Sequence, residues 1–258
     1  MNRSFLVTLL LCLSLVFCVG PKSAHAQGKP IDDDALSDVW GQALFTLDNT
    51  SANGYDFSRI TINADIKLNA NLSGIRLGEY TNSIRNGTGA DIDISKLQFG
   101  TTGTTVSVTD PYIEFVYANA ADASKRQVVG MRLGFGGIQG NIGLLMNAVS
   151  GSLLINTASG AVDSKNDTLG GIRWDGTSCA NSATCMALSQ IGGVTAGDSS
   201  GASRDFFISV LKSAVQFPTN TATGTTPDAA QSGFWLNWRD RLTALNTTGT
   251  VPANTGKK

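Results

Sequence analysis

The feature that most constrains the fold is a two-residue alternation in residues 60–72. Every even position there is apolar and every odd position is polar, over thirteen residues from Ile60 to Leu72. A helix cannot keep such a pattern on one face, whereas a strand turns it into one apolar and one polar face. A straight strand of this length would run about 40 Å, so we expect a bend. The apolar face predicts either a sheet covered by its own core or a membrane barrel facing lipid.

The composition extends this expectation to the whole chain. Charged residues make up 15% of the sequence, glycine occurs 29 times, and glutamate occurs only at Glu79 and Glu114. Few helix-favouring residues and many turn formers predict a mainly β fold, as an antiparallel sheet sandwich or solenoid-like stacked strands with one or two short helices. Residues 32–39 suit a short helix, and 204–217 suit either a helix or a strand. We expect further strands in residues 42–48, 90–99, 104–118 (broken at Asp110-Pro111), 126–135, 142–149 and 151–156. The glycine-rich run 134–140 is expected to form a turn.

The first 26 residues have the three parts of a secretory signal peptide. Arg3 precedes an apolar run over residues 5–19, and Ala24-His25-Ala26 forms a small-x-small cleavage site. The run is shorter than the roughly 20 residues that span a bilayer. We therefore expect export to the periplasm, the outer membrane surface or the extracellular space, with Gln27 as the first mature residue.

The domain organisation follows from these signals. We expect a β-rich domain in residues 27–156 and a polar, disulfide-bearing loop region in 157–203. C-terminal elements in 204–246 would pack on the β domain, with a Thr/Pro/Gly linker at 219–231 between them. Residues 247–258 are expected to form a flexible tail.

Cleavage removes the only histidine, His25, and with it the usual proton shuttle and metal ligand. It also removes two of the 19 basic residues, Arg3 and Lys22, and none of the 20 acidic ones, so the formal charge falls from −1 to −3. The mature chain has no basic stripe, which disfavours nucleic acid as a partner. We expect no enzyme activity, no cofactor and no metal site.

Two cysteines remain in the mature chain, Cys179 and Cys185, separated by small and polar residues. An isolated pair in an exported chain predicts a disulfide that closes a short loop.

We expect the last ordered element in residues 234–242, which contain the aromatic residues Phe234, Trp235 and Trp238. They predict either a partner-binding patch or rings that pack on the core. On a strand Trp235 and Trp238 face opposite ways, whereas on a helix they share a side.

The segment Asp32-Asp33-Asp34-Ala35-Leu36-Ser37-Asp38-Val39-Trp40-Gly41-Gln42 resembles a recurrent opening of exported Gram-negative proteins. Its form is acidic-acidic-x-x-Leu-Ser-x-Val-x-Gly-Gln, directly after a signal peptide. Proteins with it include a family of unknown function and some linked to surface filaments. The resemblance implies an envelope or surface protein and supplies no catalytic residue.

Together these observations predict an exported, non-enzymatic structural, adhesive or filament-associated surface protein that acts through sheet edges and loops. Its partners would be other envelope or filament proteins, or further copies of itself, and membrane association is compatible with the apolar stripe. One alternative is a small outer-membrane β-barrel or porin-like protein. The other is a polysaccharide hydrolase that uses carboxylates alone, with Glu79 and Glu114 as the candidates.

The cleavage site can be tested directly. Expression of the full chain in a Gram-negative host should yield a mature protein beginning at Gln27, by N-terminal sequencing and intact mass. A stable product that retains residues 1–26 would contradict export by a cleaved signal.

Overall fold

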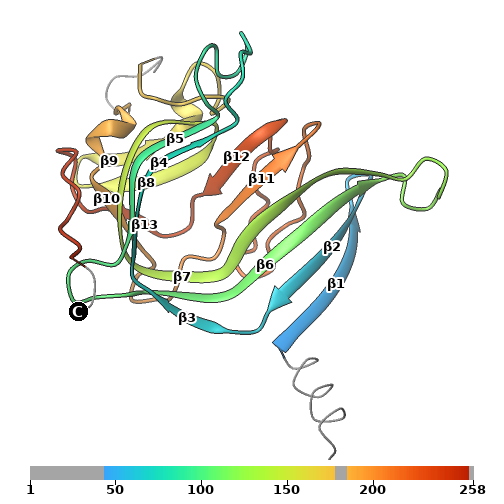
Figure 1. The fold of residues 1–258 in the computed structure, drawn as a ribbon, viewed down its shortest axis with the longest axis horizontal. Coiled ribbons are helices and arrows are strands. Elements are labelled where there is room, and N and C mark those ends of the chain that lie inside the picture. Colours follow the sequence, from blue (N-terminus) through green and yellow to red (C-terminus); the bar gives the residue numbers. More distant parts are fainter. Residues whose placement is uncertain (1–43, 178–184, 256–258) are drawn as a thin grey trace, which may run out of the picture. The chain divides into compact units, whose positions relative to one another are not determined.

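The computed structural model describes residues 44–177 and 185–255, and this part of the chain is mainly β, as predicted (Figure 1). The predicted helix at 32–39 and the mature N-terminus lie outside the described residues. The strands are β1 (Phe45–Ala52), β2 (Tyr55–Ile62), β3 (Asp65–Leu68), β4 (Ala70–Leu77), β5 (Ile92–Phe99), β6 (Val106–Ala118), β7 (Gln127–Val149), β8 (Gly151–Thr157), β9 (Gly160–Asp163), β10 (Gly193–Ala196), β11 (Phe207–Leu211), β12 (Gly233–Trp238) and β13 (Leu242–Ala244).

Strand β7 organises the sheet because its two halves have different neighbours. Its first half pairs with β6 on one edge and with β11 on the other. Its second half pairs with β5 and β10. One strand of 23 residues thus connects two parts of the structure.

The first part is a closed ring of six strands in the order β7, β10, β13, β8, β12 and β11, with β11 returning to β7. All ring pairs are antiparallel except β8 with β12 and β8 with β13. This barrel core carries extra strands, and the sandwich and solenoid arrangements are not confirmed. Strand β9 pairs with β8, and the pair β4–β5 joins the second half of β7.

The second part, which we call the arm, consists of β1, β2, β6 and the first half of β7 (residues 127–139). Their order is β1-β2-β6-β7, all antiparallel, with β3 pairing further along β6. In Figure 1 the arm extends away from the barrel toward the hairpin that joins β6 to β7. Strand β1 pairs only with β2 among the described strands, so its other edge is open.

The alternating segment forms strands, as predicted, with breaks at residues 63–64 and at Asn69. It supplies the end of β2, all of β3 and the start of β4. The expectation that its apolar residues are covered by the core is wrong for the described residues. Ile60, Ile62, Ile66 and Leu72 stay 37–46% exposed.

Two predicted interruptions lie inside strands. The glycine run 134–140, expected as a turn, belongs to β7, and Asp110-Pro111 lies within β6. Asp110 adopts a left-handed conformation with φ of 48°, yet β6 pairs with β7 on both sides of it. At Gly134 an added Cβ would lie 2.4 Å from the hydroxyl oxygen of Tyr112. Glycine at this position therefore lets the Tyr112 side chain lie directly against the β7 backbone.

The region expected as a loop, 157–203, instead contributes β9, β10 and two 3₁₀ turns, Ser164–Asn166 and Leu188–Gln190. Residues 204–217, ambiguous in sequence, contain the strand β11. Two backbone hydrogen bonds attach the described part of the C-terminal tail to the rest of the protein. The Gly249 amide donates to the Gln190 carbonyl at 2.8 Å, and the Thr102 amide donates to the Ala253 carbonyl at 3.0 Å.

Two buried apolar clusters stabilise these parts. The larger lies around the barrel strands and includes Ile142, Ile155, Val194 and Trp238. The smaller joins the arm to β11, β12 and the loop that links them, and comprises Phe57, Val116, Val129, Phe207, Leu211, Val215, Phe217, Ala230 and Trp235.

A buried ion pair ties the segment between β4 and β5 to β12. The carboxylate of Asp91 and the guanidinium of Arg85 are both at most 6% exposed and lie 3.2 Å apart. The other carboxylate oxygen accepts from the Phe234 amide at 2.8 Å, and Arg85 donates to the Phe234 carbonyl at 2.8 Å. Burial raises the pKa of Asp91, with the Phe234 amide and Arg85 opposing that shift.

Replacing Asp91 with Asn should destabilise the protein by about 3 kcal/mol, because it leaves a buried guanidinium without a counter-charge. Urea denaturation followed by tryptophan fluorescence measures this loss. The matched control is Asp65→Asn, at an exposed position on β3, which should change stability by less than about 0.5 kcal/mol. Equal stabilities of the two variants would contradict the role given to this pair.

Candidate functional site

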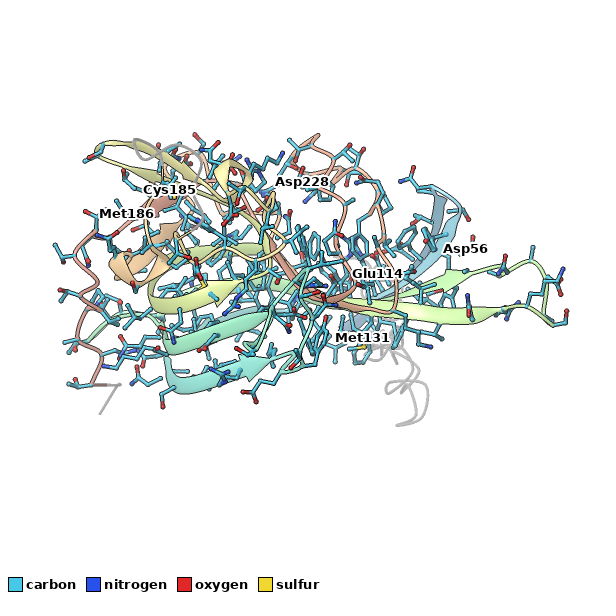
Figure 2. The ribbon with its side chains drawn as sticks, turned by 90° about the horizontal axis from the view of Figure 1, so that it is seen from above. Asp56, Glu114, Met131, Cys185, Met186 and Asp228 are labelled. Atoms are coloured by element: carbon cyan, nitrogen blue, oxygen red, sulfur yellow. The ribbon has the colours of Figure 1, made fainter. Side chains whose placement is uncertain are left out.

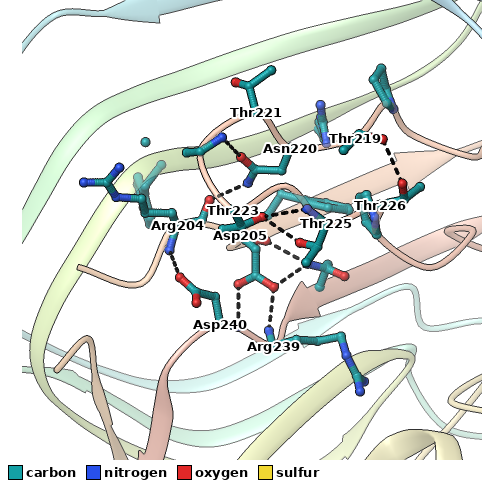
Figure 3. A pocket seen from close by; sticks show the side chains of 18 of the residues that line it. Arg204, Asp205, Thr219, Asn220, Thr221, Thr223, Thr225, Thr226, Arg239 and Asp240 are labelled. Carbon is teal, nitrogen blue, oxygen red and sulfur yellow. Dashed lines mark hydrogen bonds between the residues drawn. The ribbon is translucent and has the colours of Figure 1, made fainter. Parts of the chain in front are cut away.

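A polar cavity of about 790 Å³ lies where the arm meets β11 and β12 (Figure 3). Its floor comes from the arm strands, its wall from residues flanking β11 and β12, and its roof from the β11–β12 loop. Its size falls within the range of pockets that bind small ligands.

The floor centres on a carboxylate held between two guanidinium groups. Glu114, 2% exposed, accepts from Arg59 Nε at 2.8 Å with one oxygen and from Arg132 Nε at 2.5 Å with the other. The register of β2, β6 and β7 places these three side chains opposite one another. Arg59 also lies over the ring of Tyr112, with 4.2 Å to its centroid. Burial raises the pKa of the Tyr112 hydroxyl, although both arginines favour its ionised form.

Arg132 connects this floor to the smaller apolar cluster. Its guanidinium carbon lies 4.2 Å from the ring centroid of Phe217 and 5.0 Å from that of Phe207. Packing against these rings desolvates the arginine, so its charge depends on Glu114 for compensation.

The wall is built around Asp205, whose carboxylate accepts from the backbone amides of Arg239 at 2.8 Å and Asp240 at 3.0 Å. Burial raises the pKa of Asp205, and these two amides oppose the shift. Asn237 donates its side-chain amide to the Asp205 carbonyl at 2.7 Å. Asn237 is 1% exposed, and its Oδ1 atom has no hydrogen-bond partner in the described protein.

Two further ion pairs close the barrel side of the cavity. Arg239 binds Asp163 through two nitrogens at 2.9 and 2.6 Å. Burial alone would raise the pKa of Asp163, but the hydrogen bonds from Arg239 and the Lys165 amide lower it. Lys165 pairs with Asp228 of the loop at 2.8 Å.

The segment expected as a linker, 219–231, supplies the roof. Five threonines of this loop line the cavity, at positions 219, 221, 223, 225 and 226. Two pairs of their hydroxyls bond to each other, Thr219 with Thr226 at 2.8 Å and Thr223 with Thr225 at 2.6 Å. Asn220 anchors the loop by donating to the Arg204 carbonyl at 2.7 Å.

The opposite side of the same sheet is apolar except near the β1–β2 turn, where Asn49, Ser51, Asp56 and Ser58 lie. Register places Phe45 opposite Ile62 and Leu47 opposite Ile60, and continues across β6, β7 and β11 on the same side. We call this side the arm face; it comprises Phe45, Leu47, Ile60, Ile62, Ile113, Phe115, Val128, Met131, Leu133, Ile208 and Val210. Figure 2 shows Met131 and Glu114 on opposite sides of the arm.

Seven of these side chains are 36–67% exposed: Phe45, Leu47, Ile60, Ile62, Val128, Leu133 and Val210. Asp56, near the β1–β2 turn, is the one Asp, Glu, Lys or Arg among the β1, β2, β6, β7 and β11 residues on this side. A shallow depression of about 290 Å³ lies between β6, β7 and β11, lined by Phe115, Val128, Val129, Gly130, Met131, Val210, Leu211 and Lys212. A contiguous apolar surface of this kind marks a place of interaction.

The predicted aromatic patch lies largely inside the protein. Trp235 and Trp238, 2% and 4% exposed, point to opposite sides of β12 and belong to different apolar clusters. Phe234 is partly buried against the larger cluster. Because both tryptophans are buried, we do not assign partner binding to them.

The other predicted residues have separate outcomes. Cys185 is partly buried, and Cys179 lies outside the described residues, so their disulfide stays a prediction. Glu79 does not line the cavity that contains Glu114; it pairs with Arg76 at 2.7 Å in an exposed position.

Of the cavity residues, Glu114 alone was among the candidates predicted from the sequence. The available signal was weak: Arg59, Glu114 and Arg132 sit at positions whose two neighbours in sequence are mostly apolar, which is typical of a charge on one side of a strand. Only the strand register reveals that they meet.

In residues 44–177 and 185–255, no group of three or more His, Cys, Asp or Glu residues has the arrangement to hold a metal ion. No helix in this part of the chain has the length and apolar character required to cross a membrane. Comparison with protein-family models gives no match, and neither the curated proteins nor the solved structures give one.

Replacing Glu114 with Gln should cost about 3–5 kcal/mol of folding free energy, because Arg132 stays buried without its counter-charge. Chemical denaturation measures the loss. The control is Glu79→Gln, which removes the other glutamate of the chain from a side chain 60% exposed and should cost less than about 0.5 kcal/mol. A fully stable Glu114→Gln protein would show that the floor carboxylate is not structural.

Proposed function

We propose that this protein is an exported, non-enzymatic structural component that assembles with further copies of itself through the arm face. One observation carries the proposal: a sheet face several strands wide is apolar and exposed in the described chain. Placing such a surface in water costs free energy that association recovers.

The size of the arm face supports a stable contact. Seven exposed side chains with on the order of 80 Å² each, about half of what a large apolar side chain buries, give roughly 600 Å². A standard interface buries about 800 Å² on each partner, a little over half of it non-polar. The apolar area therefore suffices for one partner.

The chemistry of the face favours a second copy as that partner. Two arm faces bring few like charges together, since Asp56 lies near the β1–β2 turn, away from the exposed apolar residues. Sheets pack face to face at about 10 Å, with side chains of both interdigitating. In a two-fold dimer the same residues meet from both sides, and the depression beside Met131 offers a pocket for a projecting side chain.

The open edge of β1 gives assembly a second route. Its unpaired backbone groups offer a template for strand addition, and β1 also carries Phe45 and Leu47 of the arm face. Export and a disulfide between Cys179 and Cys185 belong to the same proposal, because a disulfide forms and persists in the oxidising compartments that export reaches.

The proposal is tested by light scattering coupled to size exclusion on residues 27–258 over a range of concentrations. The wild type should form dimers or larger species. Leu47→Asp combined with Leu133→Asp should give monomers with unchanged circular dichroism and melting temperature, because both side chains are about half exposed or more. The control is Thr46→Asp, an exposed position on the other side of β1, which should assemble as the wild type does.

A wild type that stays monomeric at all concentrations would overturn self-assembly. So would co-sedimentation of the monomer with phospholipid vesicles that the Leu47→Asp and Leu133→Asp changes abolish, because that outcome favours the membrane alternative. Unchanged assembly of the double variant would place the interface elsewhere.

A further inference from the structure

We propose that the cavity between the arm and the β11–β12 loop is a binding site for a neutral oligosaccharide. The inference is independent of self-assembly, because the cavity and the arm face lie on opposite sides of the sheet. It rests on three properties of the cavity: most of its charges are paired within the protein, its remaining polar groups include the hydroxyls of five threonines, and the central strands of its floor offer no open edge.

The charges of the cavity are largely satisfied within the protein. Glu114 binds both Arg59 and Arg132, Arg239 binds Asp163, and Lys165 binds Asp228. Asp205 is held by two backbone amides. An ionic ligand would have to compete with these pairs and leave a buried charge behind, which is costly. The arrangement therefore favours a ligand without charge.

The remaining groups suit a ligand rich in hydroxyls. Each threonine hydroxyl provides one donor and two acceptor sites, so the roof threonines keep hydrogen-bonding capacity beyond the bonds they make to each other. Asn237 lies in the wall, and its buried Oδ1 has no hydrogen-bond partner within residues 44–177 and 185–255. Buried acceptors in proteins nearly always have a donor, and a ligand hydroxyl would supply one.

The apolar part of the lining suits the C–H groups of a sugar ring. The aromatic residues Tyr112 and Phe207 belong to the same lining, beside Arg59 and Arg132. A pyranose combines a polar rim with C–H faces that pack on such surfaces. The cavity thus offers both kinds of contact that this class of ligand needs.

Strand pairing argues against a peptide. Recognition of an extended peptide uses a free sheet edge, but β2, β6 and β7 in the floor are each paired on both sides, and so is β12 in the wall. Strand β1 contributes Asp48, Asn49 and Thr50 to the lining, and its open edge is the one opposite β2, away from the rest of the floor. This again points to a ligand that binds through hydroxyls.

The experiment uses the mature chain, residues 27–258, and a panel of defined neutral oligosaccharides: glucans, galactans, mannans and N-acetylglucosamine oligomers. Sulfated and sialylated oligosaccharides and neutral peptides serve as comparison probes. We expect binding of at least one neutral oligosaccharide by titration calorimetry, with an affinity that changes less than about twofold between 50 and 500 mM salt, because no ion pair forms.

Two cavity variants locate the site. Thr223→Val with Thr225→Val removes two hydroxyls of the loop with little change in shape and should weaken binding about tenfold. Asn237→Ala should also weaken it, and because Asn237 supports Asp205, its folding is checked by circular dichroism. The control Thr168→Val, at an exposed position outside the cavity, should bind as the wild type does.

The arm-face double variant separates this proposal from the previous one. Leu47→Asp with Leu133→Asp should retain oligosaccharide binding even as a monomer. Absence of binding across the neutral panel, preference for charged oligosaccharides or peptides, or unchanged affinity of the Thr223→Val and Thr225→Val protein would each overturn the inference.

Discussion

Strand β7 has a hydrogen-bonded neighbour on each of its two edges, both in its first half and in its second half. The rest of the structure depends on this double pairing. The first half of β7 holds β6 and β11, and its second half holds β5 and β10. Barrel and arm are therefore parts of one hydrogen-bonded sheet. Glycine makes this possible where neighbours approach closely, as at Gly130, where an added Cβ would lie 2.2 Å from the Val210 carbonyl oxygen.

This geometry gives the arm two unlike sides. On one side the β11–β12 loop folds back over the strands and buries Phe217 against Phe57 and Phe207. The same loop roofs a cavity most of whose charges are paired. No described segment covers the other side in the same way, so its apolar side chains stay exposed. Because successive side chains of a strand point to opposite sides of the sheet, the same strands line a ligand-sized cavity on one side and form an apolar association surface on the other.

Much of the secondary structure could be predicted from the local sequence pattern. The predictions that were wrong failed for physical reasons. The alternation of residues 60–72 identified strands because periodicity reports side-chain direction directly. Glycines 134–140 and Asp110-Pro111 suggested turns, yet both lie within strands, because cross-strand packing demanded small residues or a local kink there. Short β10 was missed: four residues carry little periodic signal, and its place in the barrel comes from pairing with β7 and β13.

The sequence by itself determined the β class, the two-sided character of the strands and the absence of histidine from residues 27–258. These properties depend only on the order and kind of residues. Tertiary structure decided which side of each strand is covered, that Arg59, Glu114 and Arg132 meet, and that both tryptophans of β12 are buried. Such outcomes depend on pairing between segments far apart in the chain, where a shift of one residue in register would exchange the two sides.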